Sequence, residues 1–239
     1  MQQTDIENPY MINNVAGAEP DVRAEFIRKT YTHLAGAILA FIGIEYLLLQ
    51  LPIGQAVASW AMSGSFNMLI LFGAFIGVSW LANFWAHSNT SQGLQYFGLG
   101  VYVVAEAFFF LPILYIVTEF ASPDVIPTAG LITGTLFAGL TFIVFTTRKD
   151  FSWMRSILMI AGMVAFGIIA ASWIFSFSLG LLFSGAMVLF ASGMILYTTS
   201  NVLHHYHPTQ HVAASLALFA SVALLFWYIL RIVLAFSRN

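Results

Sequence analysis

Long apolar runs make up most of the chain and are separated by short breaks rich in glycine, proline, serine, asparagine or charged residues. A helix needs about 20 predominantly apolar residues to cross the hydrocarbon core of a bilayer. Seven runs reach that length, so the pattern predicts an all-α, polytopic membrane protein built as a seven-transmembrane-helix bundle. The predicted spans are approximately 31–50, 66–86, 93–117, 126–147, 153–175, 177–199 and 211–236.

The break between the fifth and sixth predicted spans consists only of Ser176-Phe177-Ser178. Because the stretch 153–199 is more than twice as long as one span requires, it predicts a tight helical hairpin rather than a single helix. The other connections are also short, and we find no convincing internal repeat. Residues 23–239 are therefore expected to form one transmembrane domain.

The N-terminal segment has a different composition from the rest of the chain. Residues 1–22 are polar and mildly acidic, and they lack the basic and apolar regions of a signal peptide. We expect them to form a flexible tail with no fold of its own.

Charged residues are few and unevenly placed. They make up 8% of the chain, against about 25% in soluble domains, and none lies between Glu45 and Glu106 or between Arg155 and Arg231. A surface that faces hydrocarbon needs no charge, so the gaps fit a membrane bundle. The net charge of −2 gives no reason to expect nucleic-acid binding, and the absence of cysteine excludes disulfides and thiolate metal ligands.

Lysine and arginine predict the orientation, because cytoplasmic loops carry an excess of both. Seven spans place the cations before the first span and those between the fourth and fifth on the same side, which should be the cytoplasm. The N-terminus is then cytoplasmic and the C-terminus outside, with Arg231 and Arg238 as exceptions on the outer side. The two cytoplasmic groups are Arg23, Arg28 and Lys29, and Arg148, Lys149 and Arg155.

Two acidic residues fall inside predicted spans. Glu106 lies in the middle of the third span, before Pro112, and Glu45 lies in the outer part of the first. An ionised carboxylate at the centre of a bilayer costs about 2.5–3.5 kcal/mol on insertion scales, so such a group faces the bundle interior or is protonated. Glu106 is a candidate proton or cation ligand, with a hydrogen bond between helices as the alternative. For Glu45 a structural role near the membrane interface is favoured.

Small residues recur at helical spacing in two spans. Gly73 and Gly77 in the second span, and Gly130 and Gly134 in the threonine-rich fourth span, match the GxxxG pattern. Small residues let helices approach closely, so the pattern favours helix packing over a pore lining.

Four histidines follow the sixth span in ILYTTSNVLHHYHPTQH: His204, His205, His207 and His211. Zinc usually takes three or four ligands, and Pro208 disfavours a continuous helix from His207 to His211, so the cluster is no clear metal motif. A hydrated loop is favoured, with pH sensing or a metal site as alternatives. The chain has no HExxH or GxSxG motif, so we predict neither an enzyme nor a cofactor.

Three segments taken together resemble the Bax inhibitor family of membrane proteins. TGTLFAGLTFIVFTTRKDFSWM at 133–154 resembles its fourth-span signature, in which a turn formed here by Arg148, Lys149 and Asp150 leads into the fifth span. AEAFFFLPILY resembles its third span, with Glu106 in the matching place, and MILYTTSNVL and AASLALFASVALLFWYILRIV resemble its last two spans. The resemblance covers about 24–236 and implies a seven-span fold and, for a bacterial-type member, the inner membrane.

The resemblance also marks two departures. Calcium-leak members carry two aspartates, in Ile-Leu-Tyr-Asp-Thr and Leu-Tyr-Leu-Asp, where this chain has Thr198 and Ser221. Carboxylates that share a site can hold one proton between them, whereas hydroxyls do not titrate in this way. The resemblance therefore implies the fold without the pH latch, and the candidate ion pathway or gate consists of Glu106, Thr198, Ser221 and Glu45.

Two functions remain open at this stage. The first is a cation or proton leak, or an ion-homeostasis role, with altered pH gating; calcium itself would be bound poorly. The alternative is a non-conducting regulator of a membrane AAA protease or its scaffold, to which the N-terminal tail would be presented. A small-molecule permease ranks last, because the spans show no inverted repeat. The lipid bilayer is the partner that the composition itself implies.

Overall fold

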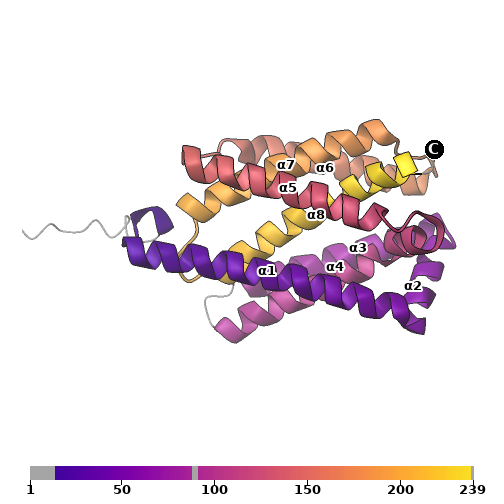
Figure 1. The fold of residues 1–239 in the computed structure, drawn as a ribbon, viewed down its shortest axis with the longest axis horizontal. Coiled ribbons are helices and arrows are strands. Elements are labelled where there is room, and N and C mark those ends of the chain that lie inside the picture. Colours follow the sequence, from indigo (N-terminus) through magenta and orange to yellow (C-terminus); the bar gives the residue numbers. More distant parts are fainter. Residues whose placement is uncertain (1–13, 88–90, 238–239) are drawn as a thin grey trace, which may run out of the picture.

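The chain folds into a bundle of long helices, seen in a computed structural model that describes residues 14–87 and 91–237 (Figure 1). Within these residues we find one short 3₁₀ helix, eight α-helices and no strand. The helices are η1 Val15–Gly17, α1 Pro20–Gln50, α2 Pro52–Met62, α3 Ser65–Ala86, α4 Gln92–Phe120, α5 Val125–Thr147, α6 Met154–Ile174, α7 Leu181–His204 and α8 His211–Ser237.

Seven of these α-helices are long and apolar enough to cross a membrane, which confirms the predicted bundle. The predicted hairpin is also present, because α6 ends at Ile174 and α7 begins at Leu181. Ser176 in this connection adopts a left-handed backbone conformation with φ of 54°, which reverses the chain within a few residues.

The short helix α2 was not predicted. Leu51 has an extended backbone after α1, and Pro52 then occupies the first turn of α2, where its missing N–H leaves no hydrogen bond unmade. The helix buries Gly54, Ala58 and Ala61, and it packs on α4, α1 and α3 at the end of the bundle remote from the start of α1 (Figure 1).

Helices α4 and α8 form the interior of the bundle. In the most apolar 18-residue stretch of each helix, 56% of the residues are buried in α4 and 50% in α8, against 6% in α3. Helix α8 packs against α1, α4, α5 and α7, and it contributes to both large apolar clusters of the core. Glu106 on α4 and Ser221 on α8 are consequently placed inside the protein.

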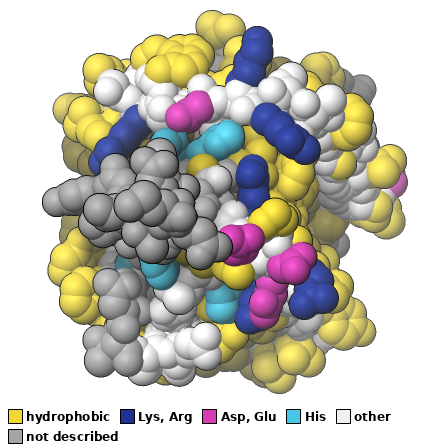
Figure 2. Space-filling view, turned by 90° about the vertical axis from the view of Figure 1, so that its left-hand side faces the viewer, with side chains coloured by type: hydrophobic (Ala, Val, Ile, Leu, Met, Phe, Trp, Pro, Cys, Tyr) yellow, Lys and Arg dark blue, Asp and Glu magenta, His cyan; other side chains and the backbone are white. Residues whose placement is uncertain are grey.

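The two ends of the bundle differ in charge. Figure 2 shows the left-hand end of Figure 1, where cationic, acidic and histidine side chains gather. Both predicted groups of lysine and arginine lie at this end, because an even number of spans, α1, α3, α4 and α5, separates them. We call it the basic end and define it by Arg23, Arg28, Lys29, Arg148, Lys149 and Arg155; the other is the opposite end.

Part of the N-terminal segment is folded, which corrects the prediction of a structureless tail over residues 1–22. Val15 is fully buried, and its amide donates a 2.9 Å hydrogen bond to the carbonyl oxygen of Tyr206 in the α7–α8 connection. Helix α1 begins at Pro20, so its polar first turns precede the predicted span. Burial of Val15 in the apolar cluster that also contains Val202 and Val212 stabilises this arrangement. Residues 1–13 of the predicted tail lie outside the described residues.

Close helix contacts occur at glycines other than those of the GxxxG pairs. A Cβ atom at Gly98 in α4 would lie 2.6 Å from the carbonyl oxygen of Ala82 in α3. Around Gly73, Gly77, Gly130 and Gly134 no atom lies within 4 Å of an added Cβ atom, and all four glycines are exposed. The expectation that these pairs pack helices within the chain is therefore wrong.

Candidate functional site

The candidate site is a cavity of about 830 Å³ between α3, α4, α6, α7 and α8. It extends from Tyr206, at the basic end, to Phe177 and Leu179 in the α6–α7 connection at the opposite end. Its volume lies in the range of about 300–1,000 Å³ that is typical of small-molecule sites. Most lining residues are aromatic, aliphatic or methionine; the polar ones are Asn83, Tyr102, Glu106, Ser172, Ser178, Tyr197, Thr198, Asn201, Tyr206, Ser221, Tyr228 and Arg231.

Three of the four residues assigned to the ion pathway line this one cavity. Glu106 comes from α4, Thr198 from α7 and Ser221 from α8, and each is nearly buried. The Ser221 hydroxyl donates a 2.8 Å hydrogen bond to the Ala217 carbonyl oxygen of its own helix. It can therefore accept a hydrogen bond inside the cavity while its proton is already engaged.

Glu106 is held by a neighbour on its own helix. The Tyr102 hydroxyl, one turn earlier, donates a hydrogen bond to the carboxyl group. The second carboxyl oxygen, Oε2, has no hydrogen-bond partner among the described residues. An ionised carboxylate is costly at this depth, so the unpartnered oxygen is a position at which a proton can bind and leave.

Glu45 is buried in α1 but does not line the cavity. Its side chain is 5% exposed, and neither carboxyl oxygen has a hydrogen-bond partner among the described residues. It interacts electrostatically with Glu106. Glu45 is thus buried inside the bundle, within electrostatic range of Glu106, and its role near the membrane interface stays a prediction.

The four histidines of the α7–α8 segment do not form one site. His205 Nε2 lies 3.1 Å from an Asp150 oxygen, and the His207 ring bonds to the Thr209 hydroxyl. The His204 Nε2 atom is buried and has no hydrogen-bond partner among the described residues. His211 is buried at the start of α8. No group of three His, Asp or Glu side chains suited to a metal occurs in the described part of the chain. Their placement therefore does not support the metal-site alternative.

His211 instead belongs to an aromatic contact that joins three helices at the basic end. Its ring centroid lies 5.1 Å from that of His33 in α1, and its Nε2 atom lies 3.4 Å from the Tyr96 hydroxyl oxygen of α4. The His33 and Tyr96 rings stack at 5.3 Å. This contact packs the first turn of α8 between α1 and α4.

The turn between α5 and α6 is fixed to the end of α7. Arg148 adopts a left-handed conformation after α5, and the Phe151 amide donates a 2.9 Å hydrogen bond to the Ser200 hydroxyl. Partial burial alone would raise the pKa of Asp150, but hydrogen bonds from the Ser152 amide and from His205 outweigh it and lower that pKa. The motif turn thus has a structural role beside the basic end of the cavity.

Tyr102 and Arg231 are the two lining residues with a partner of chemical interest that were not predicted as site residues. Tyr102 could have been found from its spacing of one helical turn before Glu106. In the sequence, Arg231 stood out only as a cation on the outer side, against the excess of lysine and arginine expected in cytoplasmic loops. It lies near the end of α8, where Nη2 donates a 3.1 Å hydrogen bond to the Leu179 carbonyl oxygen and the guanidinium carbon lies 6.0 Å from the Tyr228 ring centroid.

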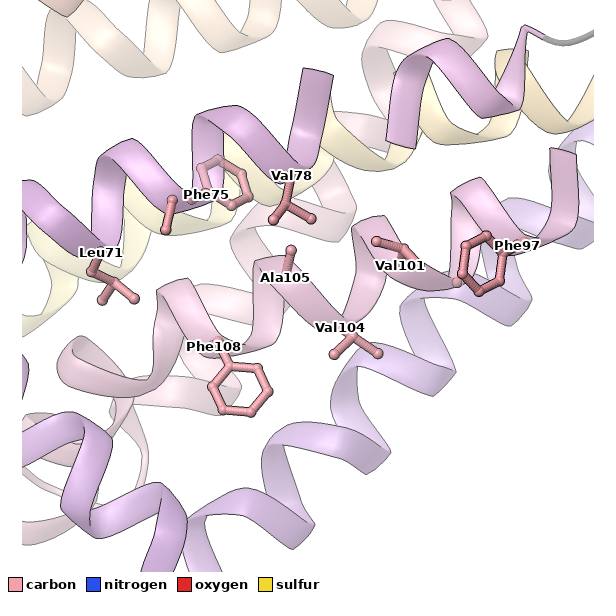
Figure 3. A pocket seen from close by; sticks show the side chains of 10 residues that line it. Leu71, Phe75, Val78, Phe97, Val101, Val104, Ala105 and Phe108 are labelled. Carbon is pink, nitrogen blue, oxygen red and sulfur yellow. The ribbon is translucent and has the colours of Figure 1, made fainter. Parts of the chain in front are cut away.

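A second hollow of about 600 Å³ lies between α3 and α4 (Figure 3). Its walls carry only apolar side chains and a glycine, so it offers no group for proton or ion chemistry. Its lining residues are Leu71, Ala74, Phe75, Val78, Phe97, Gly100, Val101, Val104, Ala105 and Phe108.

Comparison with known proteins identifies similar sequences over most of the chain. The model of the family described as "Inhibitor of apoptosis-promoting Bax1" matches residues 23–239. An uncharacterised protein of Pseudomonas aeruginosa is 28% identical over 228 residues, which cover 95% of this chain and 96% of that protein. Bax inhibitor 1 of Schizosaccharomyces pombe is 26% identical, with 94% and 82% covered. The "Modulator of FtsH protease YccA" of Escherichia coli K12 is 34% identical over 130 residues, 54% of this chain and 58% of that protein.

Proposed function

This chain belongs to the Bax inhibitor family of integral membrane proteins, and from that premise we propose that it is a non-conducting regulator of a membrane AAA protease. The likeness to the protein named as a modulator of FtsH protease supports this function. We also propose that the chain lies in a bacterial inner membrane, as the name "Inner membrane protein YccA" states for a relative. The proposal assigns no catalytic activity to the chain.

The cavity carries the argument against a calcium pathway. Calcium takes six to eight oxygen ligands, with carboxylates prominent among them. Glu106 supplies the one carboxyl group among the described lining residues, and Thr198 and Ser221 contribute hydroxyls. Two hydroxyls and one carboxyl group bind calcium poorly, and two hydroxyls cannot share a proton as a carboxylate pair does. A protein whose cavity lacks that pair is better suited to a regulatory role than to pH-gated calcium leak.

The basic end is the surface that we propose for the protease. Its six lysine and arginine residues should face the cytoplasm, since cytoplasmic segments carry an excess of these residues. The folded start of the chain, with Val15 beside Tyr206, lies at this same end (Figure 1). The cytoplasmic part of a membrane protease would therefore contact the N-terminal segment and the Arg148–Phe151 turn together.

Affinity purification from native membranes tests this function. The full-length chain should recover a membrane protease or its scaffold, and a chain that lacks residues 1–22 should recover much less. Glu106→Gln is the matched control, because it alters the cavity and leaves the basic end intact; it should recover as much as the natural chain. Failure to recover any membrane protease with any of the three chains would refute the proposal.

A proton or cation leak is the second candidate, and one observation favours it. The cavity joins the two ends of the bundle, and Glu106 presents a carboxyl oxygen without a partner in its wall. Purified protein in liposomes should then conduct, and Glu106→Gln should abolish the flux. Glu119→Gln makes the same chemical change at an exposed position of α4 outside the lining and should leave most of the flux. Absence of flux at both acidic and neutral pH, or an unchanged flux in Glu106→Gln, contradicts this candidate.

A further inference from the structure

Arg231 is a cation whose charge is not neutralised by the residues around it. Its one hydrogen bond within the described part of the chain goes to the Leu179 carbonyl oxygen, and neither described ion pair includes it. A guanidinium group carries five N–H donors in a planar fork that matches a carboxylate. One bond to a backbone carbonyl leaves most of these donors free for an anionic group.

The face of α8 that leads to Arg231 is the wall of the cavity. Residues at helical spacing along this face all line it, from Ala217 to Arg231. Fourteen residues of α-helix rise about 21 Å, whereas one acyl chain spans half of the hydrocarbon core, about 15 Å. The lining residues of this face are Ala217, Ala220, Ser221, Leu224, Trp227, Tyr228 and Arg231.

The walls of the cavity that face α8 carry aromatic side chains. Phe109 of α4 stacks on Trp227 with ring centroids 4.9 Å apart. Phe72 of α3 contacts Trp173 of α6 at 4.7 Å, and all four side chains line the cavity. An apolar chain buried here gains about 25 cal/mol for each Å² of apolar surface removed from water.

Charge sets the direction in which an amphiphile would lie. Arg231 is the one lysine or arginine among the described lining residues, and it lies beside the α6–α7 connection at the opposite end. Glu106 is the one acidic lining residue, and it belongs to the middle of α4. An anionic head group is attracted to Arg231 and disfavoured beside Glu106, which leaves the deeper part of the cavity to an apolar chain.

We propose that the cavity is a binding site for a long-chain fatty acid, whose carboxylate pairs with Arg231 and whose chain lies along α8. The bidentate geometry of a guanidinium suits a carboxylate, and the single apolar wall of α8 suits one chain. This inference rests on neither of the proposed functions.

Binding of radiolabelled palmitate to the delipidated full-length protein in detergent tests the site. The natural chain should bind saturably, with one palmitate per chain. Arg231→Gln should weaken binding at least tenfold, which corresponds to about 1.4 kcal/mol, and Arg231→Lys should restore part of the loss. Arg28→Gln, which removes an exposed cation at the other end of the bundle, should bind as the natural chain does.

Three further measurements test whether palmitate occupies the cavity with its carboxylate on Arg231. Ala220→Trp places a large ring in the cavity and should reduce binding although Arg231 remains. Hexadecyltrimethylammonium, which has the same chain and a cationic head, should not compete with palmitate. Phosphatidylglycerol added in mixed micelles should compete weakly, since two chains do not fit along one wall.

Several results would overturn the proposal. One is equal palmitate binding by the natural chain and a folded Arg231→Gln variant, which would mean that Arg231 only holds the α6–α7 connection. Another is equal competition by the cationic amphiphile or by phosphatidylglycerol, which would indicate unspecific apolar binding or a contact at the bilayer surface. If Arg231→Gln does not fold, unchanged binding by Ala220→Trp would overturn it instead.

Discussion

Replacement of Gly98 by alanine tests how closely α3 and α4 pack. The added Cβ atom would lie 2.6 Å from the Ala82 carbonyl oxygen, 2.9 Å from the Ala86 amide nitrogen and 3.1 Å from the Trp85 Cβ atom. Two of these atoms belong to the backbone of α3 and the third to the root of a side chain. None can rotate away, so the two helices must separate.

The size of the effect follows from two opposing contributions. Overpacking a close contact costs about 1–3 kcal/mol, and a backbone contact places this site near the upper limit. Replacement of glycine by alanine inside a helix increases the free energy of unfolding by about 1 kcal/mol, because alanine has the higher helix propensity. The net loss of unfolding free energy is about 2 kcal/mol. At about 2–4 °C per kcal/mol for a chain of this size, the apparent Tm should fall by about 4–8 °C.

Thermal unfolding of the purified protein in detergent measures this shift. Gly100→Ala is the matched control, because Gly100 lies on the same helix and no atom lies within 4 Å of its added Cβ atom. The control should unfold at the natural temperature or slightly above it, since it gains helix propensity without a clash. If Gly98→Ala unfolds no earlier than Gly100→Ala, the close approach of α3 and α4 at this position is refuted.

Two other substitutions test the basic end. Hydrogen bonds lower the pKa of Asp150, so its ionised form favours the folded state above about pH 4, and this stabilisation is lost as the pH falls through the lowered pKa. Asp150→Asn should therefore be less stable than the natural chain at pH 7, by under about 1 kcal/mol for so exposed a pair, and the difference should shrink as the pH falls through the lowered pKa of Asp150; a difference that does not shrink in acid counts against the reasoning. Val15→Asp should expose η1 to a protease and remove about 1.5–3 kcal/mol of burial, whereas Val22→Asp, at a position that is 44% exposed, should be cleaved like the natural chain. Equal cleavage of the two variants would show that Val15 does not hold the segment.

The seven spans could be predicted because an apolar run of about 20 residues is long enough to cross the hydrocarbon core of a bilayer. Even the break at Ser176-Phe177-Ser178 was sufficient, since 153–199 is too long for one helix. The helix boundaries were harder to predict. Polar turns of α1 extend the helix beyond the bilayer, and α2 is too short to leave a span-length pattern.

The sequence pattern could not predict which helices are buried in the bundle and which face lipid. Helices α3 and α4 have similar mean hydropathy in their best windows, 1.8 and 2.1, yet 6% of one window and 56% of the other are buried. Lipid tails are as apolar as a protein interior, so the sequence does not distinguish a face toward lipid from a face toward another helix. The same reason explains the GxxxG pairs, whose spacing suits packing although their glycines face outward.

Val15 shows a different limit of the sequence pattern. A single buried valine in a polar segment leaves no periodic signal, and its hydrogen-bond partner Tyr206 lies far along the chain. Only the folded α7–α8 connection provides the apolar contacts that hold it. Such a segment is predicted as a tail from sequence, because burial there depends on a surface that forms elsewhere.

Thr198 and Ser221 show how non-titrating side chains can be buried in the wall of a cavity between α7 and α8. A buried carboxylate needs a proton or a partner, so two aspartates in one cavity depend on each other. A serine or threonine in a helix can instead donate to the carbonyl one turn earlier, as Ser221 does to Ala217. The Ser221 hydroxyl then needs no partner across the cavity, and α7 and α8 can pack there without a shared proton. Titration at these two positions therefore cannot move the helices, and the carboxyl group of Glu106 is left as the acidic group of the described cavity wall.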